Sequence, residues 1–227
     1  MTVPKLQPRL ENRTSNRWIE RELRNLDTIK NTWDEQFNQL KSSYDKLIKI
    51  SDEKDYVLRS QIAFLFSLFD FVLHEIIKFG LVNMYSEKWE QTDHFNKIHL
   101  TMEDFKNGHR SQFSEQWFIA IQDRNYKAST LCNYKNLCEQ FKLLGLDKKE
   151  IADEAFYVQG SEEKTDEKLR HTINTLNDLR NPIVHEASID ILSLEAISLE
   201  EHEVIDLMEN INKIVEAIIK VMERKIS

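Results

Sequence analysis

The chain has 227 residues, of which 41% are hydrophobic, so it can form one domain with a sizeable core, and disorder over most of its length is excluded. Four glycines and three prolines are too few for the turns of an all-β fold or the connections of an α/β fold, which predicts an all-α fold. The net charge of −8 argues against a broad nucleic-acid-binding surface but allows a small local basic site.

Residues 1–14 are predicted to be a flexible tail, and a long helix is expected from Asn16 to about residue 50. Along this helix a hydrophobic residue recurs at every seventh position, with a second apolar line beside it, which is the pattern of a coiled-coil seam. The first line consists of Ile19, Leu26, Trp33, Leu40 and Leu47, and the second consists of Leu23, Phe37 and Tyr44. Two interpretations stay open: the helix packs on its own domain alone, or it also packs on a second subunit.

Residues 51–53 predict a break before a helix that runs from about Lys54 to Met84. The centre of this helix, residues 62–73, is apolar almost all round, which predicts a core helix buried on several sides. Asp70 is the exception, because a carboxylate in such a segment is costly unless it is paired. Asp70 either makes a structural hydrogen bond or ion pair, or supports a catalytic pocket.

Residues 86–160 are predicted to be an insertion within a single helical domain that spans residues 15–227. The first part is weakly periodic and is expected to form loops or short helices. Its three histidines, His94, His99 and His109, match no metal-ligand spacing, so we predict no metal site and no other cofactor. Helical patterns follow at 112–121, at 129–144 before Gly145, and at 147–157.

A further helix is expected from Thr165 or Asp166, which could cap it, into the segment 176–186. Residues 188–199 are predicted to be extended or irregular. Ser198 and Glu201 have the spacing of a capping box, which predicts a last helix over about 199–225.

Membrane insertion and secretion are not expected. The longest apolar stretch, 62–73, is too short to span a bilayer, and the polar start of the chain lacks the apolar core of a signal peptide. Cys132 and Cys138 lack the spacing of a zinc site or a redox pair and are interpreted as thiols of a reduced protein. These features predict a cytoplasmic protein without a membrane partner.

Arg180, Asn181 and His185 stand close together at the end of the helix that begins near Thr165. Histidine can transfer protons near neutral pH, and arginine can hold a phosphate through two parallel hydrogen bonds while asparagine positions either group. These residue types suit RNA cleavage without a metal, because the ribose 2′-hydroxyl is an internal nucleophile. The expected products carry a 2′,3′-cyclic phosphate and a 5′-hydroxyl. By spacing alone, the simpler interpretation, a helix end capped by Arg180 and His185, is favoured.

The geometry of a regular helix separates these side chains. Each residue turns by about 100°, so Arg180 and His185 would point roughly 140° apart. Either the helix is distorted near Pro182, by a kink or by a new helix that starts there, or two copies of the chain each contribute to a shared cleft.

The segment Leu179-Arg180-Asn181-Pro182-Ile183-Val184-His185 resembles the Arg-x4–6-His motif of the HEPN superfamily, with Asn181 as the polar residue that often follows the arginine. The stretch from Arg59 to Lys78 resembles the upstream helix of that family, with Asp70 at or near its acidic position. The most similar subgroup is the RiboL-PSP-HEPN-like and related stand-alone proteins of prokaryotes. The insertion at 86–160 has no counterpart in the family.

This resemblance implies an antiparallel helical bundle, a homodimer whose two motifs face each other, and metal-independent endoribonuclease activity of a toxin or antiphage-defence type. RNA would be the substrate, and an antitoxin or an associated defence protein would be a partner. His185 would act as general acid and base and Arg180 as phosphate clamp. Asn181 would position them, and Asp70 would orient a catalytic side chain.

Two other interpretations belong to different functional classes. The seven-residue apolar pattern and the acidic surface favour a non-catalytic helical interaction module or the regulatory partner of a separate effector. The resemblance also implies a third interpretation, in which a nucleotidyltransferase encoded beside this protein modifies and silences it on a tyrosine near the motif. This interpretation is weaker, because no tyrosine lies within residues 171–199.

Overall fold

A computed structural model describes residues 11–126, 130–185 and 199–226, and the side chains within 21–124, 130–184 and 199–226. The described residues form eight α-helices and one short 3-10 helix, with no strand among them, which confirms the all-α prediction. Helix α1 (Glu11–Ile50) begins at Glu11, inside the segment predicted to be a tail.

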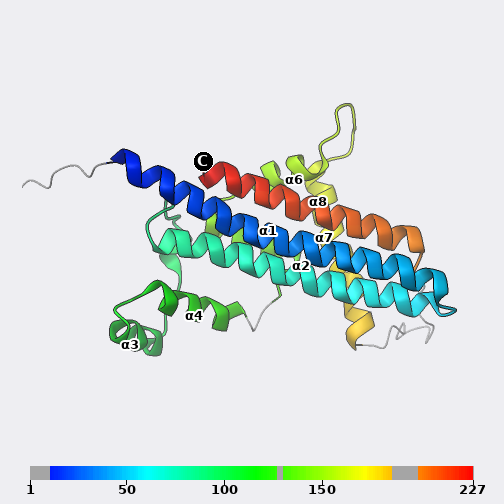
Figure 1. Cartoon of the computed structure of the whole chain (residues 1–227), viewed down its shortest axis with the longest axis horizontal. Coiled ribbons are helices and arrows are strands. Elements are labelled where there is room, and N and C mark those ends of the chain that lie inside the picture. The colour runs from blue at the N-terminus through cyan, green and yellow to red at the C-terminus, as the bar shows by residue number, and fades with distance from the viewer. Residues whose placement is uncertain (1–10, 127–129, 186–198, 227) are drawn as a thin grey trace, which may run out of the picture.

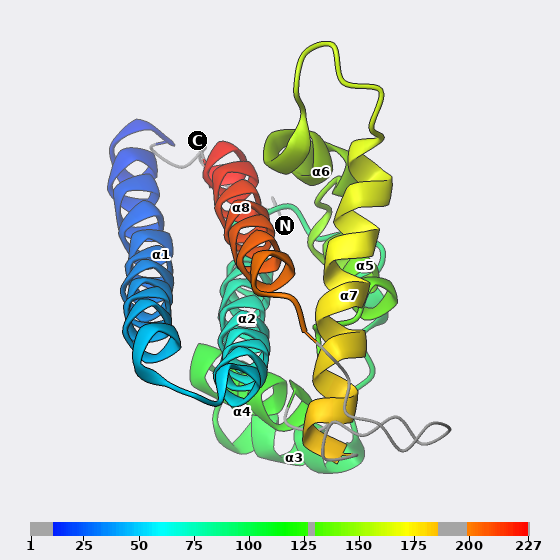
Figure 2. The ribbon, with the colours of Figure 1, turned by 90° about the vertical axis from the view of Figure 1, so that its right-hand side faces the viewer.

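Four long helices form three layers (Figures 1 and 2). Helix α2 (Lys54–Tyr85) returns antiparallel to α1 after the predicted break and lies beside α8 (Glu201–Ile226) in the middle layer. Helix α1 covers one side of this pair, and α7 (Thr165–His185) covers the other. The predicted irregular segment 188–199 lies outside the described residues except for Leu199, as does Ser198 of the predicted capping box.

The helices between α2 and α7 fall into two groups. Helices α3 (Met102–Arg110) and α4 (Glu115–Tyr126) form a lobe in which α4 packs on α2, and the 3-10 helix Phe95–Lys97 precedes this lobe. Helices α5 (Tyr134–Leu144) and α6 (Lys148–Phe156) pack on α7. The insertion is therefore largely helical.

Local capping chemistry sets the ends of these helices. Asn133 accepts hydrogen bonds from the backbone of Lys135 and Asn136, so α5 begins after it and not at residue 129 as predicted. Gly145 ends α5 with a φ of 65°, as predicted. Gln112 and Phe113 have φ values of 54° and 49°, so α4 starts only at Glu115.

The buried stripe of α1 departs from the seven-residue pattern. Its buried positions recur with the 3.6-residue period of a straight helix. A line of residues that repeats every seven positions turns by about 20° per heptad around such a helix, so it does not stay on the buried side. Trp33 is buried and donates a hydrogen bond from Nε1 to Asn212 of α8, whereas Leu47 is 45% exposed. The buried residues of the stripe are Glu22, Leu26, Trp33, Phe37, Tyr44 and Ile48.

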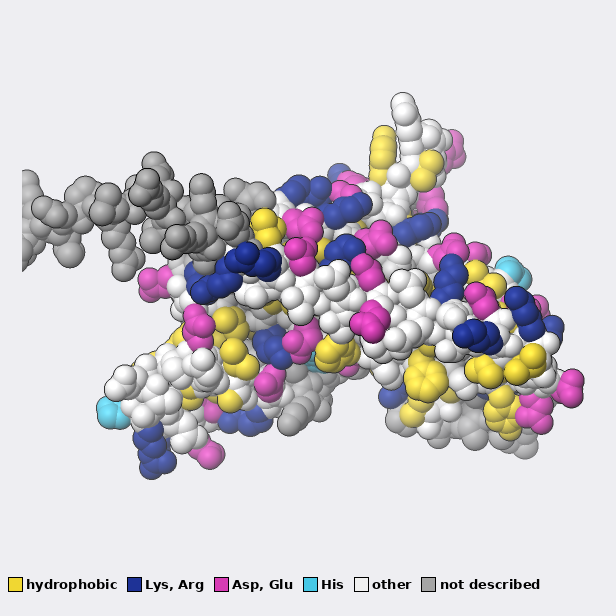
Figure 3. All heavy atoms as spheres, viewed as in Figure 1, with side chains coloured by type: hydrophobic (Ala, Val, Ile, Leu, Met, Phe, Trp, Pro, Cys, Tyr) yellow, Lys and Arg dark blue, Asp and Glu magenta, His cyan; other side chains and the backbone are white. Residues whose placement is uncertain are grey.

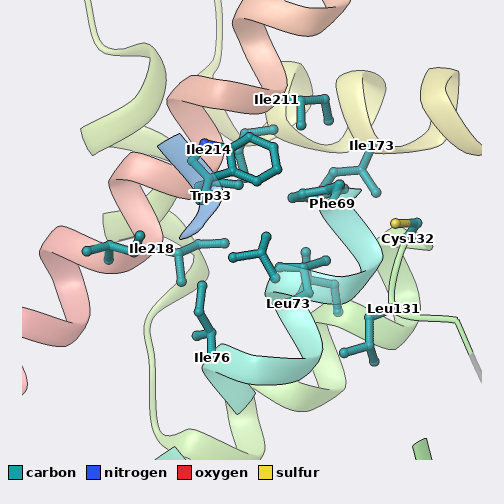
Figure 4. Close-up of a cluster of buried hydrophobic side chains, with 14 of the residues drawn as sticks. Trp33, Phe69, Leu73, Ile76, Leu131, Cys132, Ile173, Ile211, Ile214 and Ile218 are labelled. Carbon is teal, nitrogen blue, oxygen red and sulfur yellow. The ribbon is translucent and has the colours of Figure 1, made fainter. Parts of the chain in front are cut away.

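Helix α2 supplies the centre of the core but keeps one face open. Phe69 and Leu73 are fully buried among residues of α1, α7 and α8 (Figure 4), and each such side chain contributes about 1.5–3 kcal/mol by burial. Phe64 and Phe71 are 62% and 50% exposed, so the predicted burial of this helix on several sides fails on one face.

No described helix is long and apolar enough to cross a membrane.

Candidate functional site

The predicted catalytic segment closes α7. Arg180 is partly buried, and its guanidinium carbon lies 4.8 Å from the centroid of the Phe66 ring on α2. Nη1 of Arg180 also donates a hydrogen bond of 3.3 Å to Oδ1 of Asn181, whose side chain is exposed. The arginine is therefore packed against α2 by an aromatic ring while remaining accessible to solvent.

Pro182 does not end the helix. Residues 165–185 form one helix with Pro182 inside it, so no new helix starts at Pro182. The proline lacks the N–H that would bond to the carbonyl of Asp178, and α7 ends three residues later at His185. The side chain of His185 lies outside the described residues.

Asp70 accepts hydrogen bonds from residues 130–132, which lead into α5. Its Oδ1 accepts hydrogen bonds from the Thr130 hydroxyl at 2.8 Å, from the Leu131 amide at 2.7 Å and from the Cys132 amide at 3.3 Å. Its Oδ2 lies 3.3 Å from Nε2 of His74, one turn further along α2. The predicted structural hydrogen bonds are thus present, whereas orientation of a catalytic side chain by Asp70 stays a prediction.

The surroundings of Asp70 favour its ionised form. Burial raises the pKa of this carboxyl, but the hydrogen bonds from His74, Leu131 and Thr130 together outweigh burial and place the pKa below its usual range. Asp70 therefore carries a negative charge next to His74 at neutral pH.

Cys132 is fully buried, and its amide donates a hydrogen bond to Asp70. Its Sγ lies 3.6 Å from the carbonyl oxygen of Phe66. Burial and the charge of Asp70 raise the pKa of this thiol well above its usual value, against a smaller opposite effect of Arg180. Cys132 therefore stays protonated, and a thiolate nucleophile at this position is disfavoured.

Three successive turns of α2 each contribute one residue near the predicted catalytic segment. Phe66 contacts Arg180, and Asp70 and His74 follow at intervals of four residues on the same strip of the helix surface. Arg180 and Asp70 both act on the Cys132 thiol, and Asn181 is hydrogen-bonded to Arg180, so the structure brings these predicted site residues into one region. The sequence interpretation missed His74 and Phe66, although the four-residue spacing of Asp70 and His74 on a helix could have identified the former.

The histidines of the insertion do not form a metal site. His94, His99 and His109 are exposed side chains on the 3-10 helix N-cap, a loop and α3. Within the described ranges, no group of three or more histidine, cysteine, aspartate or glutamate side chains could hold a metal ion.

Comparison with known proteins finds no match: no family model, no curated protein and no solved structure is similar to this chain. The similarity of residues 179–185 to the HEPN motif therefore remains a prediction from the residues themselves.

Proposed function

We propose that this protein is a metal-independent endoribonuclease of the HEPN type, active as a homodimer with a composite site, in a toxin or antiphage-defence role. The observation that carries this proposal is the end of α7, where Arg180 is accessible on the Phe66 ring and Asn181 and His185 follow on one continuous helix. The proposed phosphate clamp and the proposed proton-transfer group would then lie within a few residues of each other at the end of one helix.

The continuity of α7 supports a composite site. Residues 165–185 form one helix, and on a regular helix positions 180 and 185 lie roughly 140° apart, which makes it difficult for one copy to aim both at the same phosphate. Two α7 ends that face each other would place both residue types around one phosphate. This is why the proposal requires two copies.

The proposed reaction needs two proton transfers and no co-reactant. The ribose 2′-oxygen gives its proton to one His185 and bonds to phosphorus as the bond from phosphorus to the 5′-oxygen breaks. The leaving oxygen takes a proton from the other copy's His185. Arg180 stabilises the charge that collects on the phosphate oxygens, and the products are a 2′,3′-cyclic phosphate and a 5′-hydroxyl.

The test uses the purified full chain and a structured RNA in the presence of a chelator. We expect cleavage by the wild type and loss of cleavage in His185→Ala, with helical content and oligomeric mass unchanged. Cleavage that persists in His185→Ala, or that needs a divalent ion, would contradict the mechanism.

A non-catalytic interaction module is the second candidate, and the open face of α2 favours it because Phe64 and Phe71 are exposed there. Expression in a bacterial host separates the two candidates. Growth arrest that Arg180→Ala relieves supports the nuclease, whereas harmless expression together with absence of cleavage in vitro supports the module.

A further inference from the structure

The outer surface of α3 exposes apolar and basic side chains side by side. Met102, Phe105, Lys106 and His109 have the spacing of one helical face, and all four are exposed, Met102 by 71% and Phe105 by 52%. These four residues and the neighbouring Phe113 are called the α3 face. Figure 3 shows side chains of histidine and of lysine or arginine at the tip of the α3–α4 lobe, with hydrophobic side chains also exposed on it. A contiguous exposed set of this kind indicates a binding surface.

Phe113 is held in one orientation at the edge of this face. Its ring centroid lies 5.6 Å from that of Phe105 and 5.2 Å from that of Trp117, against which it stands at 89°. Its amide donates a hydrogen bond of 2.7 Å to the carbonyl of Gly108, and its carbonyl accepts one from the Tyr85 hydroxyl. The ring is 38% exposed, so it is fixed by its contacts and still open to a ligand.

The backbone that carries Phe113 is strained. Gln112 and Phe113 have φ values of 54° and 49°, a conformation that costs free energy for residues other than glycine. Gly108 makes room for the ring, because a Cβ at this position would lie 2.6 Å from two ring carbons of Phe113. Such strain is typical of ligand contacts, where a side chain must be held in place before the ligand arrives.

The exposed charges of α3 are mostly positive. Lys106 and Arg110 are exposed, and His109 lies beside them on the same helix. Of the two acidic residues of α3, Glu103 is exposed, whereas Asp104 is buried and paired with an arginine of α4. Because the whole chain has a net charge of −8, this is a local departure toward positive charge. Charge therefore favours an anionic ligand at the α3 face.

We propose that the α3 face binds single-stranded RNA, with unpaired bases stacked on Phe105 and Phe113 and phosphates paired with Lys106 and Arg110. Stacking needs rings whose planes are fixed and cations close to them, and both are present. A membrane surface would not need a fixed ring, because burial of apolar area is non-directional. A stable protein contact covers about 800 Å² on each partner, which is more than one face of a nine-residue helix offers.

The choice of RNA as the ligand rests on the proposed function and deepens it, because it specifies a substrate with unpaired bases. Phe66, on which Arg180 lies, and Tyr85, which bonds to Phe113, are about 28 Å apart along α2. In both Figure 1 and Figure 2 the α3–α4 lobe and the last turns of α7 lie at the lower edge of the bundle. A stacked strand advances about 3.4 Å per nucleotide, so about eight nucleotides would connect the α3 face with Arg180.

The first test measures binding of the purified full chain to a single-stranded RNA of about sixteen nucleotides, a length that single-strand sites cover. The riboses of this probe carry 2′-O-methyl groups, which remove the nucleophile and prevent cleavage. Fluorescence anisotropy should show binding by the wild type, and Phe105→Ala should raise the Kd about tenfold through loss of one stacked base. A blunt duplex of the same length should bind more weakly, because its bases are paired.

Phe64→Ala is the matched control, because it removes a phenylalanine that is 62% exposed on α2. It should bind the probe as the wild type does. Phe113→Gly gives a second variant, since glycine suits the φ of 49° while the ring is lost. It should weaken binding, with the helical content unchanged in circular dichroism.

Three results would overturn the proposal. The wild type does not bind the probe, or Phe105→Ala binds it as tightly as the wild type, or Phe64→Ala weakens binding as much as Phe105→Ala. Binding to vesicles of anionic phospholipid that depends on Phe105, without binding of the probe, would assign the face to a membrane and would likewise contradict RNA as the ligand.

A salt titration tests the phosphate contacts separately. The double variant Lys106→Ala/Arg110→Ala should lower the slope of log affinity against log salt by about 1.4, because each phosphate contact on a single strand contributes about 0.7. Phe105→Ala should leave this slope unchanged. The charge-matched control is Lys142→Ala/Lys164→Ala, whose side chains are 56% and 74% exposed on other parts of the chain. Equal changes of slope in the two double variants would show a general charge effect and contradict the site.

These outcomes separate the α3 face from the nuclease. If the wild type binds the probe through Phe105 but cleaves no RNA, the α3 face stands and the proposed function fails. If RNA is cleaved and Phe105→Ala changes neither probe binding nor the KM for the long RNA, the function stands and the α3 face fails. If both hold, Phe105→Ala should raise the KM for the long RNA and leave cleavage of a dinucleotide unchanged, because a dinucleotide cannot reach from Arg180 to the α3 face.

Discussion

The guanidinium of Arg180 rests on an aromatic ring and is not enclosed by the core, so its replacement should affect chemistry more than folding. We predict that Arg180→Ala lowers the rate of RNA cleavage by about 10²–10³-fold, as loss of one charge-stabilising donor does in other enzymes. Arg180→Lys should also lose most activity, because an ammonium lacks the two parallel donors of the guanidinium.

Arg170→Ala provides the control on the same helix, since Arg170 is exposed and lies almost three turns before the segment. It should cleave RNA at the wild-type rate. Equal losses in the two alanine variants, measured as initial rates, would show that Arg180 acts only through general charge.

Asp70 should contribute to stability whether or not the protein cleaves RNA. Asp70→Ala leaves the amide of Leu131 and the hydroxyl of Thr130 without their acceptor, which should lower the free energy of unfolding by about 1–3 kcal/mol. Asp70→Asn keeps an acceptor oxygen and should cost less. Urea unfolding of both variants measures the difference, and equal stability of all three proteins would refute this role.

The ionised form of Asp70 also predicts a pH dependence. Its pKa is lowered in the folded protein, so its contribution to stability is present above the usual pKa of the group and is lost as the pH falls through the folded value. The stability gap between the wild type and Asp70→Asn should therefore shrink as the pH is lowered below about 3.9, the usual pKa of an aspartate. A gap that widens under acid conditions would mean that folding raises the pKa of Asp70 and does not lower it.

At the scale of elements, the α3–α4 lobe depends on one buried carboxylate. Asp104 and Thr101 form a capping box at the start of α3, and Arg124 of α4 lies 2.7 Å from Oδ1 of Asp104. The hydrogen bonds from Arg124 and Thr101 hold the pKa of Asp104 well below its usual range.

We predict that Asp104→Asn weakens this lobe by about 1 kcal/mol, the usual value of a helix cap. Hydrogen exchange should become faster in α3 and α4 and stay unchanged in α8, which does not pack on them. Uniform acceleration in all helices would instead mean that the lobe unfolds together with the bundle.

The ends of the elements could be predicted where local chemistry sets them. Gly145 and the break at 51–53 were identified because they are local signals. The sequence left open whether α7 continues through Pro182 or a new helix starts there, because a proline near a helix end removes one backbone hydrogen bond while the neighbouring residues keep theirs. The open face of α2 was missed, since an apolar run does not show which of its residues the chain itself covers.

At the scale of the whole molecule, the all-α class followed from composition, but the three-layer arrangement needed the structure. The seven-residue line of α1 predicted either packing on its own domain or packing on a second subunit. Leu26 and Trp33 pack inside, while Leu47 is left exposed, so the structure supports the first interpretation over part of the helix and leaves the second open over the rest. Spacing alone could not place Arg180 on Phe66, because that contact joins helices far apart in the sequence.

The claim that two copies build one site is tested most directly by mixing subunits. Wild type is equilibrated with an equal amount of the inactive Arg180→Ala/His185→Ala double variant, and RNA cleavage in the presence of a chelator is measured. If each site needs the α7 ends of two copies, mixed dimers are inactive, and activity per wild-type chain falls to about half. Undiminished activity per wild-type chain, or no cleavage by the wild type itself, would contradict the composite site.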